Sequence, residues 1–272
     1  MSTTRKNIIF VAAVLIGFWG IFVSYNHWTA EYAFNKGLTL TAQKRYGEAV
    51  PYYKKAIRLF PSEDFYRMHD GKNKLFLSSV TQLPVPTRMK IAKEAESIFQ
   101  DLMVRDELNP WYSLRLSEVY GQMAKIDPKQ GALYMIKSGE ALKHSATVDA
   151  NNPIFLFSYA QYLFSTKQYD VALPLLEEVY ETDPSILGSA TLLGKVYIYK
   201  QRYPEALDVF KHVYKQNPRV VPSIRNLSEA YYLAGDYDKA LHIIQIYGTH
   251  DKAPTILRDY YQFLINAPKS GK

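Results

Sequence analysis

The chain has 272 residues, a formal net charge of +7 and no cysteine. The absence of cysteine excludes disulfide bonds, thiolate metal sites and cysteine nucleophiles. The positive charge is modest and dispersed, so it predicts no nucleic-acid partner, although it favours acidic partners or anionic lipid headgroups.

The first predicted element is an apolar helix near the N-terminus. Residues 8–23 contain no charged or strongly polar side chain. The longer segment 7–28 would form a helix of roughly 33 Å, which is enough to cross a hydrocarbon core of about 30 Å. Tyr25 and Trp28 stand where an interfacial aromatic belt is expected. We therefore predict a transmembrane helix over 7–28.

The charges that flank this segment predict its orientation. Arg5 and Lys6 precede it, and positive residues favour the cytoplasmic side of a membrane. We therefore expect residues 1–6 in the cytoplasm and the repeats on the outer face of the cytoplasmic membrane, in a periplasmic or extracytoplasmic location. A cleaved secretory signal is the alternative. The candidate cleavage sites at 23–25 and 28–30 lack the usual small residues, which favours an uncleaved signal-anchor.

A first repeat-like segment follows at 30–63. Its apolar pattern comprises Gly37, Tyr46, Ala49, Tyr53, Ala56 and Pro61. Nothing between residues 23 and 36 would break a helix. We therefore expect the apolar helix to continue into the first helix of this segment, without a flexible tether.

The next segment, 64–152, keeps helical apolar periodicity but loses the repeat pattern. Proline-containing breakers separate four predicted helices, Phe65–Val80, Arg88–Val104, Trp111–Met123 and Gly131–His144. We interpret this segment as two degenerate helix pairs with longer helices or turns.

Three further segments, 153–186, 187–220 and 221–254, share one pattern at an interval of 34 residues. In each, a tyrosine is followed by an alanine and then by a bulky apolar residue: Tyr169, Ala172 and Leu176, then Tyr203, Ala206 and Phe210, then Tyr237, Ala240 and Ile244. Their first helices share a slot for a small residue, held by Ala160, Gly194 and Ser228. Such self-similarity is typical of a solenoid, in which each unit buries its apolar face by stacking on its neighbours.

This pattern resembles the tetratricopeptide repeat, a helix–turn–helix unit with small and large apolar residues at fixed offsets. The resemblance covers 30–63 and 153–254. It departs from the family at the second small position of the later helix, which holds Val179, Val213 and Tyr247. No segment shows the alternation of a strand. We therefore predict an all-α, tetratricopeptide-like α-solenoid of about six helix pairs, a capping helix and tail at 255–272, and one N-terminal transmembrane helix.

The resemblance also implies a binding surface, because the first helices of this family line a concave groove that takes extended or helical peptides. By slot, the groove residues for a protein partner are Phe157, Gln161, Phe164, Lys195, Tyr199, Arg225, Glu229 and Tyr232, with Phe34 and Leu38 on the same face of 30–63. We expect the aromatic residues to bury apolar anchors, and Lys195 and Arg225 to hold a carboxylate. The alternative for each residue is packing between neighbouring units.

Two of these residues argue against one mode of binding. Members of the family that bind a peptide C-terminus use asparagines in these slots, whereas this chain has Gln161 and Glu229. Capture of a C-terminal carboxylate is therefore not expected.

No motif predicts catalysis, a metal site or a cofactor. The six histidines share no ligand spacing, and the chain lacks the HExxH, GxSxG and GxGxxG patterns. An enzyme with a cryptic site in 64–152 is the least favoured hypothesis.

Together these features predict a membrane-anchored scaffold that mediates protein–protein interaction at the outer face of the cytoplasmic membrane. It would act as an assembly factor or chaperone-like adaptor. The alternative is a permanent accessory subunit of an envelope complex, such as a pilus, secretion or polysaccharide-export system.

Overall fold

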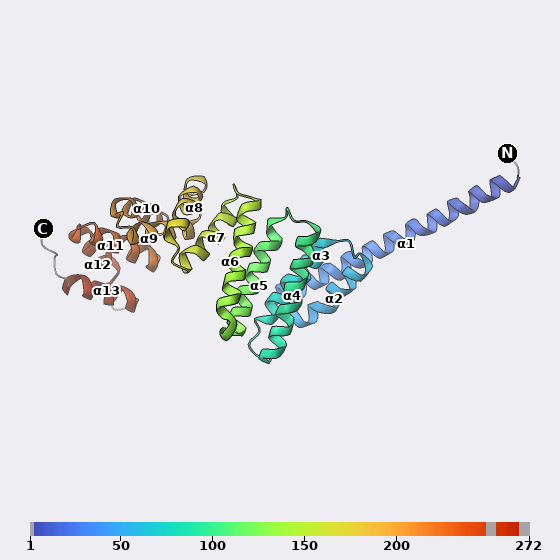
Figure 1. The fold of residues 1–272 in the computed structure, drawn as a ribbon, viewed down its shortest axis with the longest axis horizontal. Coiled ribbons are helices and arrows are strands. Elements are labelled where there is room, and N and C mark those ends of the chain that lie inside the picture. Colours follow the sequence, from blue (N-terminus) through green and yellow to red (C-terminus); the bar gives the residue numbers. More distant parts are fainter. Residues whose placement is uncertain (1–2, 249–253, 267–272) are drawn as a thin grey trace. The chain divides into compact units, whose positions relative to one another are not determined.

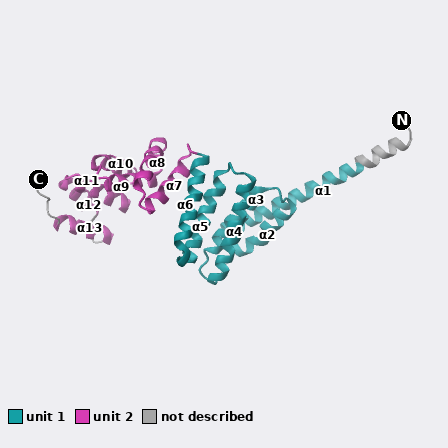
Figure 2. Cartoon of the chain, viewed as in Figure 1, with its two compact units in different colours: residues 1–149 teal, residues 150–272 magenta. Residues whose placement is uncertain are grey.

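The computed structural model describes residues 3–248 and 254–266, with side chains from residue 14 onward. Every regular element within these ranges is helical, which confirms the all-α prediction. The chain divides into two compact units, 1–149 and 150–272, which Figure 2 colours separately.

Unit 1 contains three helix pairs, followed in chain order in Figure 1. Its elements are α1 (Thr3–Ala42), α2 (Tyr46–Leu59), α3 (Asp64–Ser78), α4 (Val85–Arg105), α5 (Pro110–Ile126), the short 3-10 turn η1 (Pro128–Gln130) and α6 (Gly131–Val148). The partners α1–α2, α3–α4 and α5–α6 pack together, and α2 packs on α3 as α4 packs on α5. Each pair thus buries its apolar face partly against its own partner and partly against the next pair.

Unit 2 repeats the same arrangement with shorter helices. Its elements are α7 (Pro153–Ser165), α8 (Tyr169–Thr182), α9 (Leu187–Tyr199), α10 (Tyr203–Gln216), α11 (Val221–Leu233), α12 (Tyr237–Gly248) and α13 (Thr255–Asn266). The first helices of the pairs begin at residues 153, 187 and 221, and α13 begins at 255, so α13 continues the interval of 34 residues. The described chain therefore holds six helix pairs and one further helix, as predicted.

Small residues on the first helices let the paired helices approach closely. A Cβ atom added at Gly194 would lie 2.6 Å from the buried ring of Phe210 on the partner helix. The same relation joins Gly37 to Tyr53, where the added Cβ would lie 3.0 Å from the ring. A large side chain on the second helix thus fills the space that the small residue leaves, which accounts for the predicted slots.

The turns inside the repeats also recur. The residue two positions before the second helix has a positive φ, between 59° and 84°, in four of the pairs: Lys44, Lys167, Gln201 and Gly235. The amide after it donates a hydrogen bond of 2.8–2.9 Å to a carbonyl five residues earlier. This is the Schellman pattern that ends a helix, and it holds the second helix at a constant angle to the first.

The middle segment, 64–152, keeps the same packing with a longer second helix. Gly71, which lies 34 residues after Gly37, would place an added Cβ 2.9 Å from the ring of Phe99 on α4. A proline-containing segment separates α3 from α4 as predicted, and α4 begins at Val85, so Pro86 lies in its first turn, where a missing amide hydrogen costs nothing. The helix pair α3–α4 is therefore a regular repeat with an extended second helix.

The first helix, α1, is a single helix of 40 residues, so the apolar segment continues into the first repeat as predicted. Its N-terminal half extends beyond the other helices of its unit (Figure 1), and Leu15 and Trp19 are 63% and 68% exposed. Within the described residues, no helix has both the length and the apolar character that a membrane span requires. The predicted span, 7–28, lies partly outside the residues whose side chains are described, and it stays a prediction.

Candidate protein-binding surfaces

The predicted groove residues all lie on the first helices of unit 2. Phe157, Gln161 and Phe164 are on α7, Lys195 and Tyr199 on α9, and Arg225, Glu229 and Tyr232 on α11. Each of the eight side chains is half-buried or exposed. Seven of these side chains form three groups with different surroundings, and Lys195 belongs to none of the three.

The first group lines a cleft of about 450 Å³ between α7 and α9, which the first turn of α11 closes at one side. Phe157 and Gln161 form one wall, and Gly188 and Thr191 form the other. A Cβ added at Gly188 would lie 2.9 Å from the Phe157 ring, so the glycine allows that ring to lie against the backbone of α9. The cleft combines an apolar floor with the hydrogen-bonding groups of Gln161 and Thr191.

The second group is an aromatic cluster at the C-terminal ends of α7 and α9. The rings of Tyr169 and Tyr199 stack with centroids 4.5 Å apart and an interplanar angle of 10°. Phe164 contacts both, with centroid distances of 5.4 Å to Tyr169 and 6.2 Å to Tyr199. Tyr199 is exposed, so the stack presents a rigid aromatic surface to a partner.

The third group is covered by α13, which the sequence-based slots did not foresee. The Arg225 guanidinium lies 5.9 Å from the Tyr260 ring centroid, and Tyr232 contacts Phe263 with centroids 5.8 Å apart. Burial and the negative charge of Glu229 raise the pKa of Tyr260. This part of the groove is thus partly occupied by the chain's own last helix, in the place where a further repeat would pack.

The groove was predicted to hold two cations, Arg225 and Lys195. Within the described chain α13 contacts Arg225, whereas no contact joins it to Lys195. It is half-buried on α9 and enters no ion pair among the described residues. Lys195 lines neither the cleft nor the aromatic cluster. The open surface of α7 and α9 therefore carries one uncompensated positive charge beside its aromatic residues.

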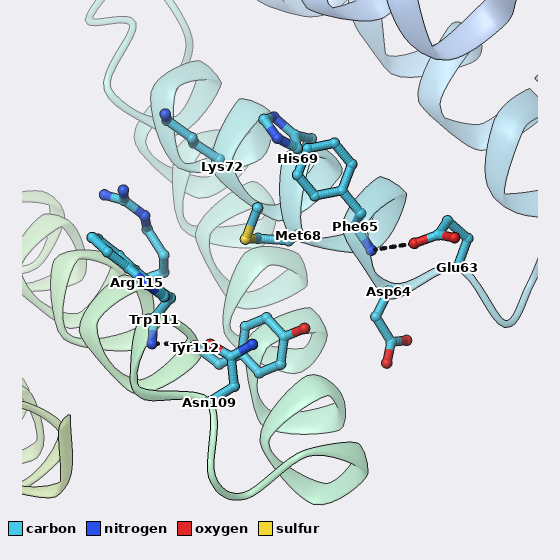
Figure 3. Close-up of a pocket in the computed structure, with 10 residues that line it drawn as sticks. All are labelled: Glu63, Asp64, Phe65, Met68, His69, Lys72, Asn109, Trp111, Tyr112 and Arg115. Atoms are coloured by element: carbon cyan, nitrogen blue, oxygen red, sulfur yellow. Dashed lines mark hydrogen bonds between the residues drawn. The ribbon is translucent and has the colours of Figure 1, made fainter. Parts of the chain in front are cut away.

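A second surface, in unit 1, was missed by the sequence-based slots. A pocket of about 470 Å³ lies between α3 and α5, the first helices of neighbouring pairs. Figure 3 shows its lining residues: Glu63, Asp64, Phe65, Met68, His69, Lys72, Asn109, Trp111, Tyr112 and Arg115. Phe34, expected on this face, is instead buried against Tyr53 and Tyr66.

The signal for this pocket is present in the sequence. Met68 and Lys72 on α3 occupy the same helical positions, counted from the start of the helix, as Phe157 and Gln161 on α7. Trp111 and Arg115 are spaced four apart on α5 and therefore share a face. Extending the repeat register from 30–63 into the next pair would have identified the α3 residues.

Comparison with protein-family models matches two parts of the chain to the tetratricopeptide repeat, at residues 30–63 and 191–247. A third model, of subunit 3 of the anaphase-promoting complex (cyclosome), matches residues 136–213. The chain is a tetratricopeptide-repeat protein. No curated protein matches it significantly by sequence.

Solved structures share this tetratricopeptide-repeat fold at low sequence identity. The Pseudomonas aeruginosa pilF protein matches with a TM-score of 0.63 and 10% identity, over 87% of this chain and 98% of that one. A tetratricopeptide repeat protein from Parabacteroides merdae matches with a TM-score of 0.59 and 12% identity, over 87% and 89%. TTC0263 from Thermus thermophilus matches with a TM-score of 0.51 and 17% identity, over 75% and 99%. At these identities the likeness shows the fold alone.

In this tetratricopeptide-repeat protein, both surfaces lie on first helices of the pairs. Tetratricopeptide repeats form scaffolds for protein–protein interaction. Within the described ranges, no group of three or more histidine, aspartate or glutamate side chains is arranged to hold a metal ion.

Proposed function

We propose that this protein is a membrane-anchored scaffold that binds other proteins through the first helices of its repeats. The observation that carries the proposal is the open surface of α7 and α9. It presents a cleft and an exposed aromatic stack on successive repeats. Lys195, which enters no ion pair among the described residues, lies four residues from both Thr191 of the cleft and Tyr199 of the stack. Exposed aromatic residues beside a cleft are typical of protein interfaces.

The proposed location is the outer face of a cytoplasmic membrane, with the N-terminus inside. Two observations support it: residues 8–23 carry no charge, and the apolar side chains of α1 from Leu15 to Trp28 are largely exposed to their surroundings. Because α1 runs without interruption into the first repeat, the anchor would hold the first repeat at a fixed angle. Clients would then meet the scaffold close to the membrane surface.

The anchor makes a direct biochemical prediction. The full-length protein should stay with membranes during carbonate extraction and be released by detergent, because an uncharged helix of this length partitions into hydrocarbon. Protease added from the outer side should digest the repeats. A mature N-terminus between residues 25 and 31, or release by carbonate, would contradict the anchor.

The binding surface makes a second prediction. Reversing the charge of the open surface with Lys195→Glu should strongly reduce co-purification of partners, because acidic groups of a client would meet a like charge. Lys195 forms no ion pair among the described residues, so its reversal should leave helicity nearly unchanged. Affinity purification with quantitative mass spectrometry measures the loss, and circular dichroism measures helicity.

The matched control reverses one exposed cation on a second helix. Lys215→Glu makes the same change in net charge on α10 and should leave partner recovery close to that of the unmodified protein. Equal losses from both variants would place binding elsewhere on the repeats.

A further inference from the structure

We propose that the α3–α5 pocket binds an acidic protein segment, which inserts one large apolar side chain between Met68 and Trp111 and places a carboxylate at Lys72 and Arg115. The inference rests on the proposed protein-binding function and specifies a second site for it, in unit 1. It names the chemistry of the occupant, an apolar residue with an acidic neighbour.

The apolar half of the pocket is open to solvent. Phe65 is 49% exposed and Trp111 is 38% exposed, and both line the pocket with the half-buried Met68. A volume of about 470 Å³ accommodates a large side chain and part of its backbone. Exposed rings next to a flexible thioether favour insertion of an aliphatic or aromatic anchor.

The chain itself compensates the cationic half only in part. Lys72 enters no ion pair among the described residues. Its Nζ lies 5.9 Å from the centroid of the Phe76 ring on the same helix. Arg115 Nη1 pairs with Glu118 at 2.6 Å on the same helix, and its guanidinium lies 5.9 Å from the Trp111 ring centroid. The other N–H groups of the Arg115 guanidinium remain for a second carboxylate.

His69 adds no positive charge at this end. Burial first, and then the charges of Lys72 and Arg115, lower the pKa of His69 below its ordinary value. The imidazole is therefore neutral at pH 7, and the positive charge of the pocket belongs to Lys72 and Arg115.

The two acidic side chains of the pocket already interact with other groups of the chain. Glu63 accepts a hydrogen bond from the Phe65 amide at 3.3 Å and caps α3, and Asp64 pairs with Arg105 at 3.5 Å. Figure 3 shows Glu63 and Asp64 on one side of the pocket and Lys72 and Arg115 on the other, with Met68 between them. At the end of the pocket that Lys72 and Arg115 form, charge complementarity thus favours a carboxylate of an acidic segment.

The test starts from an unbiased probe, a random dodecapeptide phage library selected on the full-length protein in detergent. Selected sequences should carry aspartate or glutamate within about three positions of leucine, isoleucine, phenylalanine or tryptophan. One of them, synthesised with an amidated C-terminus, is then titrated by fluorescence. The chain has three tryptophans, so Trp19→Phe with Trp28→Phe leaves Trp111 as the only reporter, and its emission should change on binding.

Charge variants then assign the site. Lys72→Glu with Arg115→Glu should weaken binding of that peptide by about tenfold or more, and Lys72→Gln with Arg115→Gln should weaken it less. The matched control, Lys90→Glu with Lys93→Glu on the exposed side of α4, should change binding by less than about twofold. Circular dichroism of the glutamine pair shows whether the fold is retained.

Several results would overturn the inference. They are selection of no peptide, selection of peptides without acidic residues, a Trp111 signal that does not respond, or binding that survives both charge variants. Self-association of the chain that Lys72→Glu and Arg115→Glu abolish would identify a second copy as the occupant instead. Loss of peptide binding only with Lys195→Glu would retain the proposed function and reject this second site.

Discussion

Replacing Lys74 by methionine should lower the free energy of unfolding by about 3–5 kcal/mol, because the change leaves a buried charge without its partner. Lys74 Nζ lies 2.5 Å from Asp70 Oδ2, and both side chains are only 6% exposed. Asp70 Oδ1 has no hydrogen-bond partner within the described part of the chain. No other group is therefore placed to compensate the carboxylate once the ammonium is gone.

Denaturant unfolding followed by circular dichroism measures this effect. Lys90→Met, on the exposed side of α4, is the matched control and should change stability by no more than about 0.5 kcal/mol. The double change Asp70→Leu with Lys74→Met should regain most of the loss, since both charges are then absent. Hydrogen exchange should locate the damage in unit 1, because repeats contact only their neighbours. Equal stability of Lys74→Met and Lys90→Met would show that the pair is not buried as described.

Gly194→Ala should destabilise the protein by about 1–2 kcal/mol, although alanine is the better helix former by about 1 kcal/mol. The added Cβ would lie 2.6 Å from the ring of Phe210, which is buried, so the ring or one of the two helices must shift. At Gly121, an added Cβ would meet no atom within 4 Å. Gly121→Ala should therefore stabilise by about 1 kcal/mol, and the difference between the two variants measures the steric conflict.

A second variant tests that cause. Phe210→Leu removes the ring edge, so Gly194→Ala should cost less in that background than in the unmodified protein, and a double-mutant cycle gives the coupling. Thermal or denaturant unfolding of the four proteins is sufficient. If Gly194→Ala stabilises as Gly121→Ala does, the two helices are not in the close approach that the repeat requires.

The regular repeats could be predicted from the sequence because their packing uses few residues at fixed positions. A glycine such as Gly194 and a ring such as Phe210 recur at one spacing, and that spacing also fixes the turn between the helices. In the middle segment the partner of Gly71 is Phe99, which lies much farther along the chain. A longer loop and a longer α4 shift the second helix out of register, so a fixed template fails after Gly71.

The same reason explains what was missed at the candidate site. Met68 and Lys72 hold first-helix positions in a repeat that the fixed 34-residue pattern did not identify, and both line the pocket. On α11, the slots of Arg225 and Tyr232 were identified, but sequence spacing does not tell which neighbour covers them. The path of the chain into α13 decides this, and that path depends on the packing of whole helices rather than on local pattern.

Site-specific photocrosslinking in cells tests most directly the claim that first helices bind partner proteins. A benzoylphenylalanine is placed at Gln161 or Tyr199, which are exposed on α7 and α9, or at Glu178 or Lys211, which are exposed on the second helices α8 and α10. The proposed function predicts that Gln161 and Tyr199 crosslink to the same partner and that Glu178 and Lys211 do so weakly or not at all. Crosslinking to that partner with equal or greater yield from Glu178 and Lys211 would contradict it.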